Sequence, residues 1–111
     1  MKMQLKKINN IIILYLTGRL DVQFSINIEK EIYQLIQSEP DHHILLNLAD
    51  VKYMSSSGIR IFVSTMRILK EKEKKMKLCN LSDSVKKIFE VVELLDMFDV
   101  YNSEQEAIGC F

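Results

Sequence analysis

The run of six apolar residues from Ile11 to Leu16 constrains the fold of this chain more than any other feature. The run is rich in isoleucine, and β-branched residues favour strands. A continuous apolar run, as opposed to an alternating one, is typical of a strand that is covered on both faces. It is much shorter than the roughly 20 residues that span a bilayer. We therefore expect the interior strand of a sheet that has helices packed against it, and no membrane-spanning segment.

The remaining periodicities alternate between strands and helices. Residues 1–5 alternate apolar and polar side chains, as in a half-buried strand, and Asn9-Asn10 indicates a turn because asparagine tolerates positive φ. The further expected elements are strands at 44–48, 77–80 and 97–101, helices at 28–36, 58–69 and 85–92, a loop at 49–57, and a last helix that begins at Asn102 or Ser103. This order predicts an α/β fold with a small, mixed, mainly parallel sheet that about four helices cover.

Length and charge restrict the class of protein. The 111 residues are enough for one domain, which we place at 1–111, and 15 basic side chains balance 15 acidic ones. A net charge of zero argues against a nucleic-acid partner and a polybasic membrane anchor. The basic stretch at 70–75 is interpreted as a solvated helix end, with Glu71–Lys75 and Glu73–Lys77 as i,i+4 ion pairs. The first residues lack the apolar stretch of a signal peptide, so we expect a cytoplasmic protein.

The sequence offers little for catalysis or metal binding. Cys79 and Cys110 lie far apart and are interpreted as reduced thiols. The adjacent residues His42 and His43 point to opposite faces of any strand, so they are assigned to a solvated loop or to the start of a strand. A nucleophile elbow of the form G-x-S-x-G fails because Met54 stands where it needs glycine. We expect no metal, no cofactor and no enzymatic activity.

One segment is a candidate functional site: Ser55-Ser56-Ser57-Gly58, which lies at the start of a predicted helix. One serine suffices to cap a helix, and this segment has three. The start of a helix after a strand presents unpaired N–H groups and the positive end of the helix dipole, which accommodate an anion. A serine phosphorylated here would carry about −1.5 to −2 charges. Gly58 removes a side chain where a partner backbone could approach, and Arg60 either pairs with the phosphate or faces solvent.

Several segments together resemble the STAS-domain anti-sigma factor antagonists, and the resemblance covers nearly the whole chain. The segments that carry it are Leu16-Thr17-Gly18-Arg19-Leu20-Asp21, Ile44-Leu45-Leu46-Asn47-Leu48, Tyr53-Met54-Ser55-Ser56-Ser57-Gly58-Ile59, Ser84-Val85-Lys86-Lys87-Ile88-Phe89 and Ser103-Glu104-Gln105-Glu106-Ala107. The family implies a STAS fold and a switch protein that binds an anti-sigma factor and thereby frees a sigma factor. The implied partners are an anti-sigma factor that is also a serine kinase with an ATPase fold, and a serine phosphatase, the chain itself being a monomer or a weak dimer.

The family pattern Asp-Ser-Ser-Gly places the modified serine two residues before the glycine, at Ser56. Ser57 is the rival, although we expect Ser57 to cap the helix. The aspartate that follows Thr-Gly-x-Leu in the family maps to Asp21. The expected partner-binding residues are Asp21, Ser55, Ser56, Ser57, Gly58 and Arg60.

This chain departs from the family pattern at Ser55, where many members have aspartate, and at Glu93, where a glycine often follows the third helix. The missing aspartate motivates an alternative function, a STAS interaction subunit of a transporter or signalling complex that is not phosphorylated. A small-ligand or nucleotide-binding domain is a third possibility, which only the anion-binding helix start supports.

Overall fold

A computed structural model describes residues 2–111. Five strands form one sheet in the order β1-β2-β3-β4-β5. Strand β1 (Lys2–Ile8) pairs antiparallel with β2 (Ile11–Leu20), and the turn between them has Asn9 at a φ of 54°, as predicted. The other pairs are parallel and join β2 to β3 (His43–Met54), β3 to β4 (Met76–Cys79) and β4 to β5 (Asp99–Tyr101). Met1, which was predicted to begin the first strand, lies outside the described residues.

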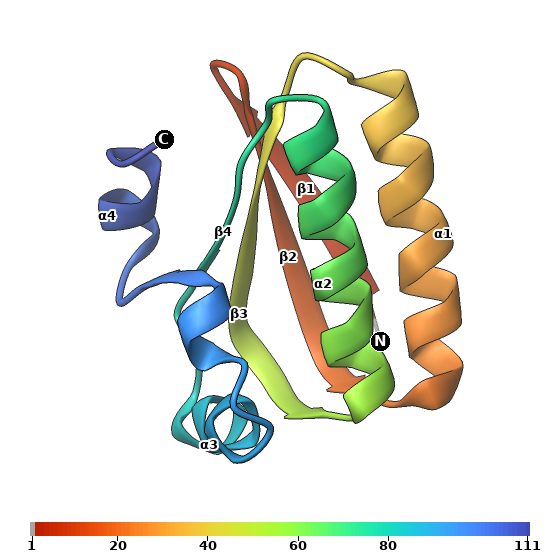
Figure 1. The fold of residues 1–111 in the computed structure, drawn as a ribbon, viewed down its shortest axis with the longest axis vertical. Coiled ribbons are helices and arrows are strands. Elements are labelled where there is room, and N and C mark those ends of the chain that lie inside the picture. The colour runs from red at the N-terminus through yellow and green to blue at the C-terminus, as the bar shows by residue number, and fades with distance from the viewer. Residues whose placement is uncertain (1) are drawn as a thin grey trace.

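Helices cover both faces of this sheet. Helices α1 (Val22–Ser38) and α2 (Ser56–Glu71) pack side by side on one face, and the short α4 (Glu104–Ile108) lies on the other (Figure 1). Helix α3 (Asp83–Val91) and the 3-10 turn η1 (Leu95–Met97) lie near the end of the sheet at which α2 begins. The predicted alternation of strands and helices and the mainly parallel sheet are confirmed. Within residues 2–111, no helix is long and apolar enough to cross a membrane.

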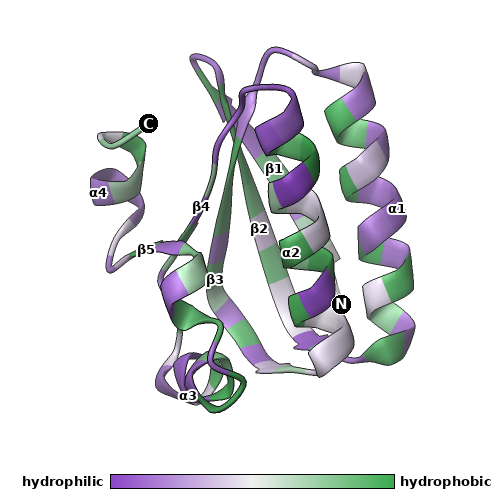
Figure 2. Ribbon diagram, viewed as in Figure 1, coloured by the Kyte–Doolittle hydropathy of each residue, from purple (hydrophilic) through white to green (hydrophobic). Residues whose placement is uncertain are grey.

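The apolar run Ile11–Leu16 at the start of β2 is largely buried on both faces, as its composition predicts, whereas Thr17 and Arg19 nearer the end of the strand are exposed. Ile12, Leu14 and Leu16 belong to the main core beneath α1 and α2, and Ile11 and Ile13 belong to a second cluster beneath α4. Figure 2 colours the first part of this strand mostly green and its later part paler and purple, and it shows both green and purple residues on the helices. The period of two in a strand sends neighbouring side chains to opposite layers, so one apolar run fills two cores.

Strand β3 is longer than predicted. Residues 49–54, which were expected in a loop, continue the strand up to Met54, which is the register partner of Leu20. The prediction was wrong because this part of the strand does not alternate: Val51 and Met54 are buried and the residues between them are exposed. The register between β2 and β3 shifts twice along this stretch, which breaks the period of two.

The charged stretch after α2 also differs from its prediction. Helix α2 ends at Glu71, and Glu73 adopts a φ of 59° that stops the helix. The predicted i,i+4 pairs therefore do not form. Lys77 instead lies buried in β4, and its Nζ is 3.2 Å from the Asp99 carboxylate of β5. Its pKa is raised, since the hydrogen bonds to Tyr101 and Asp99 outweigh the opposing effect of burial.

Candidate phosphorylation and docking site

Two helix starts meet where β2 and β3 end. Asp21 caps α1, since its Oδ1 accepts a hydrogen bond from the backbone N–H of Phe24 at 3.1 Å. Ser55 caps α2, since its Oγ accepts a hydrogen bond from the N–H of Gly58 at 3.2 Å. Because α1 and α2 lie side by side, both positive dipole ends are at the same end of the molecule (Figure 1).

The hydroxyl of Ser55 is fully engaged within the chain. Besides accepting from Gly58, it donates to the carbonyl oxygen of Leu20 at 3.1 Å, and the Ser55 N–H donates to the same oxygen at 2.9 Å. Ser55 thus ties the start of α2 to the residue before the α1 cap. We expected Ser57 to cap the helix, and that expectation is wrong. Serine and aspartate are both favoured helix caps, so α2 keeps an N-terminal cap with Ser55 at this position.

The side chains of the other two serines differ in exposure. Ser56 is the first residue of α2 and is exposed, and among the described residues its hydroxyl makes no hydrogen bond. Ser57 is half-buried and lines a hollow of about 170 Å³ between α1 and α2, together with Ser25 and Glu29. Of the three hydroxyls, only that of Ser56 is both exposed and uncommitted at the helix start.

Gly58 is buried for a reason that lies within the chain. A Cβ at position 58 would be 2.8 Å from Cδ2 of Leu20 and 3.2 Å from its carbonyl oxygen. The absence of a side chain therefore allows α2 to pack against the end of β2. The reason that we predicted for this glycine, the approach of a partner backbone, is not needed to explain it.

Arg60 is exposed one helical turn after Ser56. Both residues line a groove of about 390 Å³ that also includes Arg67 of the same helix. Across the groove lie Val92 and Met97, from the segment that follows α3. This groove was not predicted, although the apolar residues after α3 are a signal that could have indicated it.

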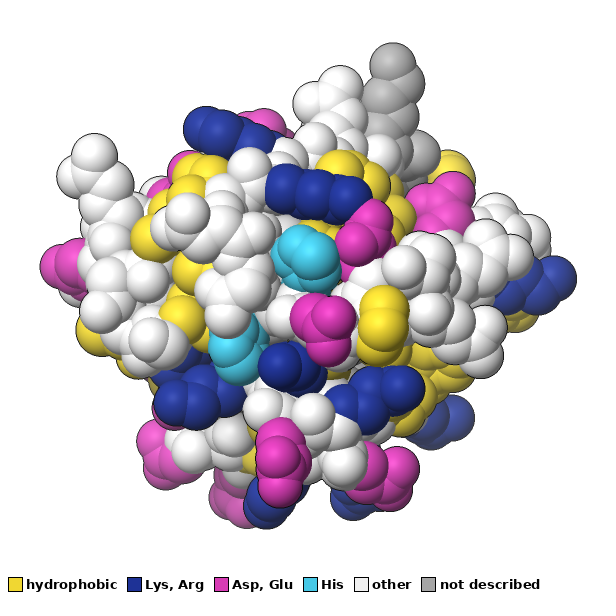
Figure 3. All heavy atoms as spheres, turned by 90° about the horizontal axis from the view of Figure 1, so that it is seen from above, with side chains coloured by type: hydrophobic (Ala, Val, Ile, Leu, Met, Phe, Trp, Pro, Cys, Tyr) yellow, Lys and Arg dark blue, Asp and Glu magenta, His cyan; other side chains and the backbone are white. Residues whose placement is uncertain are grey.

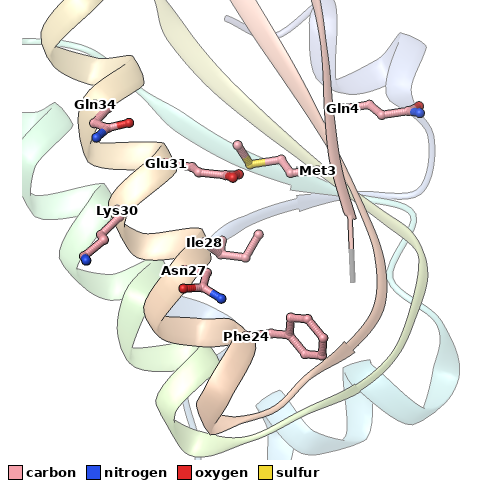
Figure 4. A pocket seen from close by; sticks show the side chains of 8 residues that line it. All are labelled: Met3, Gln4, Phe24, Asn27, Ile28, Lys30, Glu31 and Gln34. Atoms are coloured by element: carbon pink, nitrogen blue, oxygen red, sulfur yellow. The ribbon is translucent and has the colours of Figure 1, made fainter.

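A larger hollow of about 590 Å³ lies between β1 and α1 (Figure 4). Met3, Phe24 and Ile28 extend into the space between strand and helix, whereas Gln4 points away. None of the residues that line it belongs to the predicted site, so this hollow does not bear on the serine triplet.

The end of the molecule opposite the serine triplet is polar. Figure 3 shows basic and acidic side chains interspersed there around His42 and His43. His43 begins β3 and its Nδ1 accepts a hydrogen bond from the N–H of Lys75 at 2.9 Å. Burial and the nearby lysines lower the pKa of this histidine. The assignment of the histidines to a strand start is confirmed for His43.

Known proteins resemble this chain in sequence and in fold. The sequence profile of the STAS domain matches residues 2–107. An anti-sigma-B factor antagonist from Staphylococcus epidermidis is 30% identical over 83 residues, which are 75% of this chain and 76% of that protein. Two solved structures of SpoIIAA also match. The anti-sigma factor antagonist SpoIIAA in its unphosphorylated form has 27% identity and a TM-score of 0.82, covering 96% of this chain and 93% of that one. The Bacillus cell fate determinant SpoIIAA in its phosphorylated form has 25% identity and a TM-score of 0.73, covering 97% of each chain. The predicted resemblance is therefore confirmed, and the chain belongs to the STAS domain family.

Proposed function

We propose that this chain is an anti-sigma factor antagonist that phosphorylation of Ser56 switches off. Unmodified, it binds an anti-sigma factor that is also an ATP-dependent serine kinase, and a sigma factor is released. A serine phosphatase restores the binding form. The chain acts by binding and not by catalysis. The relatives that are called anti-sigma factor antagonists, and the SpoIIAA structures in phosphorylated and unphosphorylated forms, support the proposal.

The observation that carries the assignment to Ser56 is its exposure. Ser55 is held by Gly58 and Leu20, and Ser57 is half-buried beside α1, whereas Ser56 offers a free hydroxyl at the start of α2. The uncapped N–H groups and the dipole of a sixteen-residue helix favour a phosphate at this position. The chain can therefore accept the modification without unfolding.

The physical reason for dissociation is electrostatic. A standard protein–protein interface buries about 800 Å² on each partner. We assign Asp21, the serine triplet and Arg60 to the interface with the anti-sigma factor, whereas Gly58, which was also predicted to contact the partner, is buried within the chain. A dianion that is buried in such an interface costs several kcal/mol unless a cation neutralises it. Since each 1.4 kcal/mol changes affinity tenfold, a single phosphate is enough to end binding.

The direct test is phosphorylation in vitro. Incubation with the cognate kinase and ATP should add one phosphate, which intact mass spectrometry detects and fragmentation localises to Ser56. Ser56→Ala should abolish the modification, and Ser57→Ala is the matched control that should keep it. Phosphate on Ser57 would overturn the assignment, and no phosphate on the wild-type chain would overturn the mechanism.

The second test concerns binding. Ser56→Asp should weaken the affinity for the anti-sigma factor and leave the fold intact. Ser84→Asp is the matched control, because Ser84 is an exposed serine in the first turn of α3. Equal affinity of Ser56→Asp and the wild-type chain would contradict the electrostatic reasoning.

The alternative, an unphosphorylated STAS subunit of a transporter or signalling complex, was motivated by the missing aspartate. Because Ser55 supplies the cap that an aspartate would supply, this departure from the family pattern no longer favours the alternative.

A further inference from the structure

An apolar groove separates α2 from the segment that follows α3. The residues that line it are Ser56, Ile59, Arg60, Val63, Arg67, Val92, Leu94 and Met97. Two of its large apolar side chains are well exposed, Val92 at 40% and Met97 at 46%. Exposed apolar side chains that gather along one groove are typical of a surface that another protein covers.

Two unpaired arginines follow the α2 side of this groove. Arg60 and Arg67 are both exposed, and within residues 2–111 neither lies within salt-bridge distance of a carboxylate. The two arginines are seven positions apart on the helix, which is about two helical turns or about 10 Å. Cations beside an apolar floor favour a partner that presents carboxylates beside apolar side chains.

We propose that this groove binds an acidic amphipathic helix of the anti-sigma factor. The apolar face of that helix covers Val92 and Met97, and two carboxylates about two turns apart pair with Arg60 and Arg67. Helices dock into apolar grooves in this manner, with anchors on one face. This inference rests on the proposed function and extends the contact surface from the serine triplet along α2.

The position of Ser56 couples this groove to the phosphorylation switch. Ser56 lies at one end of the groove and is one turn from Arg60 on the same helix face. A phosphate on Ser56 competes with the partner's carboxylate for Arg60 and repels that carboxylate. One modification thereby removes a cation from the docking surface and adds negative charge to it.

The apolar contact is tested with two neighbouring valines. Val92→Asp places a charge on the floor of the groove, whereas Val91→Asp introduces the same charge at a side chain that is 81% exposed and does not line the groove. Isothermal titration with the purified anti-sigma factor should show at least tenfold weaker binding for Val92→Asp and for Met97→Asp, and no change for Val91→Asp. Circular dichroism and thermal unfolding show whether all three variants are folded.

The charged contact is tested at Arg67, which is about three turns from Ser56. Arg67→Glu should weaken binding up to about tenfold at low salt, and the loss should shrink as salt is added. Lys6→Glu makes the same change of charge on the exposed edge of β1 and should leave the affinity unchanged.

The outcomes separate this inference from the proposed function. If the wild-type chain does not bind the anti-sigma factor, the proposed function fails. If it binds and the Val92, Met97 and Arg67 variants bind equally well, the groove is not part of the interface and the inference is wrong. A second copy of this chain as the occupant is a further overturning result. Sedimentation would then show a wild-type dimer that Val92→Asp dissociates.

Discussion

Replacement of Gly58 by alanine is expected to destabilise the protein because the new side chain is too close to one residue, Leu20. The added Cβ would lie 2.8 Å from Cδ2, 3.0 Å from Cγ and 3.2 Å from the carbonyl oxygen of Leu20. Leu20 is fully buried, so its side chain cannot move aside freely. Overpacking of this kind costs about 1–3 kcal/mol, and the better helix propensity of alanine returns about 1 kcal/mol. We expect a net loss of about 1 kcal/mol.

A double-mutant cycle tests whether Leu20 is the cause. Leu20→Ala alone should cost about 2–5 kcal/mol, because it leaves a cavity in the core. Without Cγ and the Cδ atoms, the contacts at 2.8 and 3.0 Å are removed and only the 3.2 Å contact with the carbonyl oxygen remains, so Gly58→Ala should cost much less in that background. Urea unfolding of the wild-type chain, both single variants and the double variant should show a coupling of about 1–3 kcal/mol. Additive effects, within about 0.5 kcal/mol, would refute the packing explanation.

Three further predictions concern stability and reactivity. Glu93 has a φ of 59° in the turn that ends α3, a conformation that glycine adopts without strain. Glu93→Gly should therefore stabilise the protein by about 1 kcal/mol in urea unfolding. Glu90→Gly, within α3, should destabilise it by a similar amount because glycine disfavours helices. The pKa of His43 is lowered in the folded chain, so the unfolded chain takes up a proton at this residue more readily. The contribution of His43 to the free energy of unfolding should therefore be complete above about pH 6.5 and decrease below it. In unfolding experiments across this pH range, His43→Asn should show a smaller decrease. Burial raises the pKa of the Cys79 thiol to about 12, whereas Cys110 is exposed. Iodoacetamide should therefore alkylate only Cys110 in the native protein and both cysteines in urea. Equal alkylation rates of the two cysteines in the native state would contradict the burial of Cys79.

The order of strands and helices was predictable because it depends on local periodicity. The apolar run of β2 and the i, i+4 stripe of α1 each indicate their elements without tertiary information. The end of β3 was not predictable in this way, since two register shifts against β2 break its alternation. The partner of Lys77 was also beyond local reasoning, because Asp99 reaches it from a strand that is 22 residues away.

The serine triplet also combines features that local sequence predicts with features that depend on tertiary contacts. Its position before a helix could be predicted from the sequence and the family pattern. Which serine caps the helix could not, because the choice depends on the carbonyl oxygen of Leu20, 35 residues earlier. The groove could not be predicted without the tertiary structure. Arg67 and Met97 belong to different elements, and only the packing of α2 beside η1 brings them to one surface.

The hydrogen bonds of Ser55 also bear on stoichiometry. To transfer a phosphoryl group to Ser55, an enzyme would have to open the first turn of α2 and detach it from the neighbouring strand. Ser57 is half-buried in the hollow between α1 and α2, so its hydroxyl is less accessible to an enzyme than that of Ser56. We therefore expect the serine triplet of the folded chain to carry either no phosphate or one. Each molecule is then either fully active or fully inactive in binding, and the cellular response depends on the fraction of molecules that are modified.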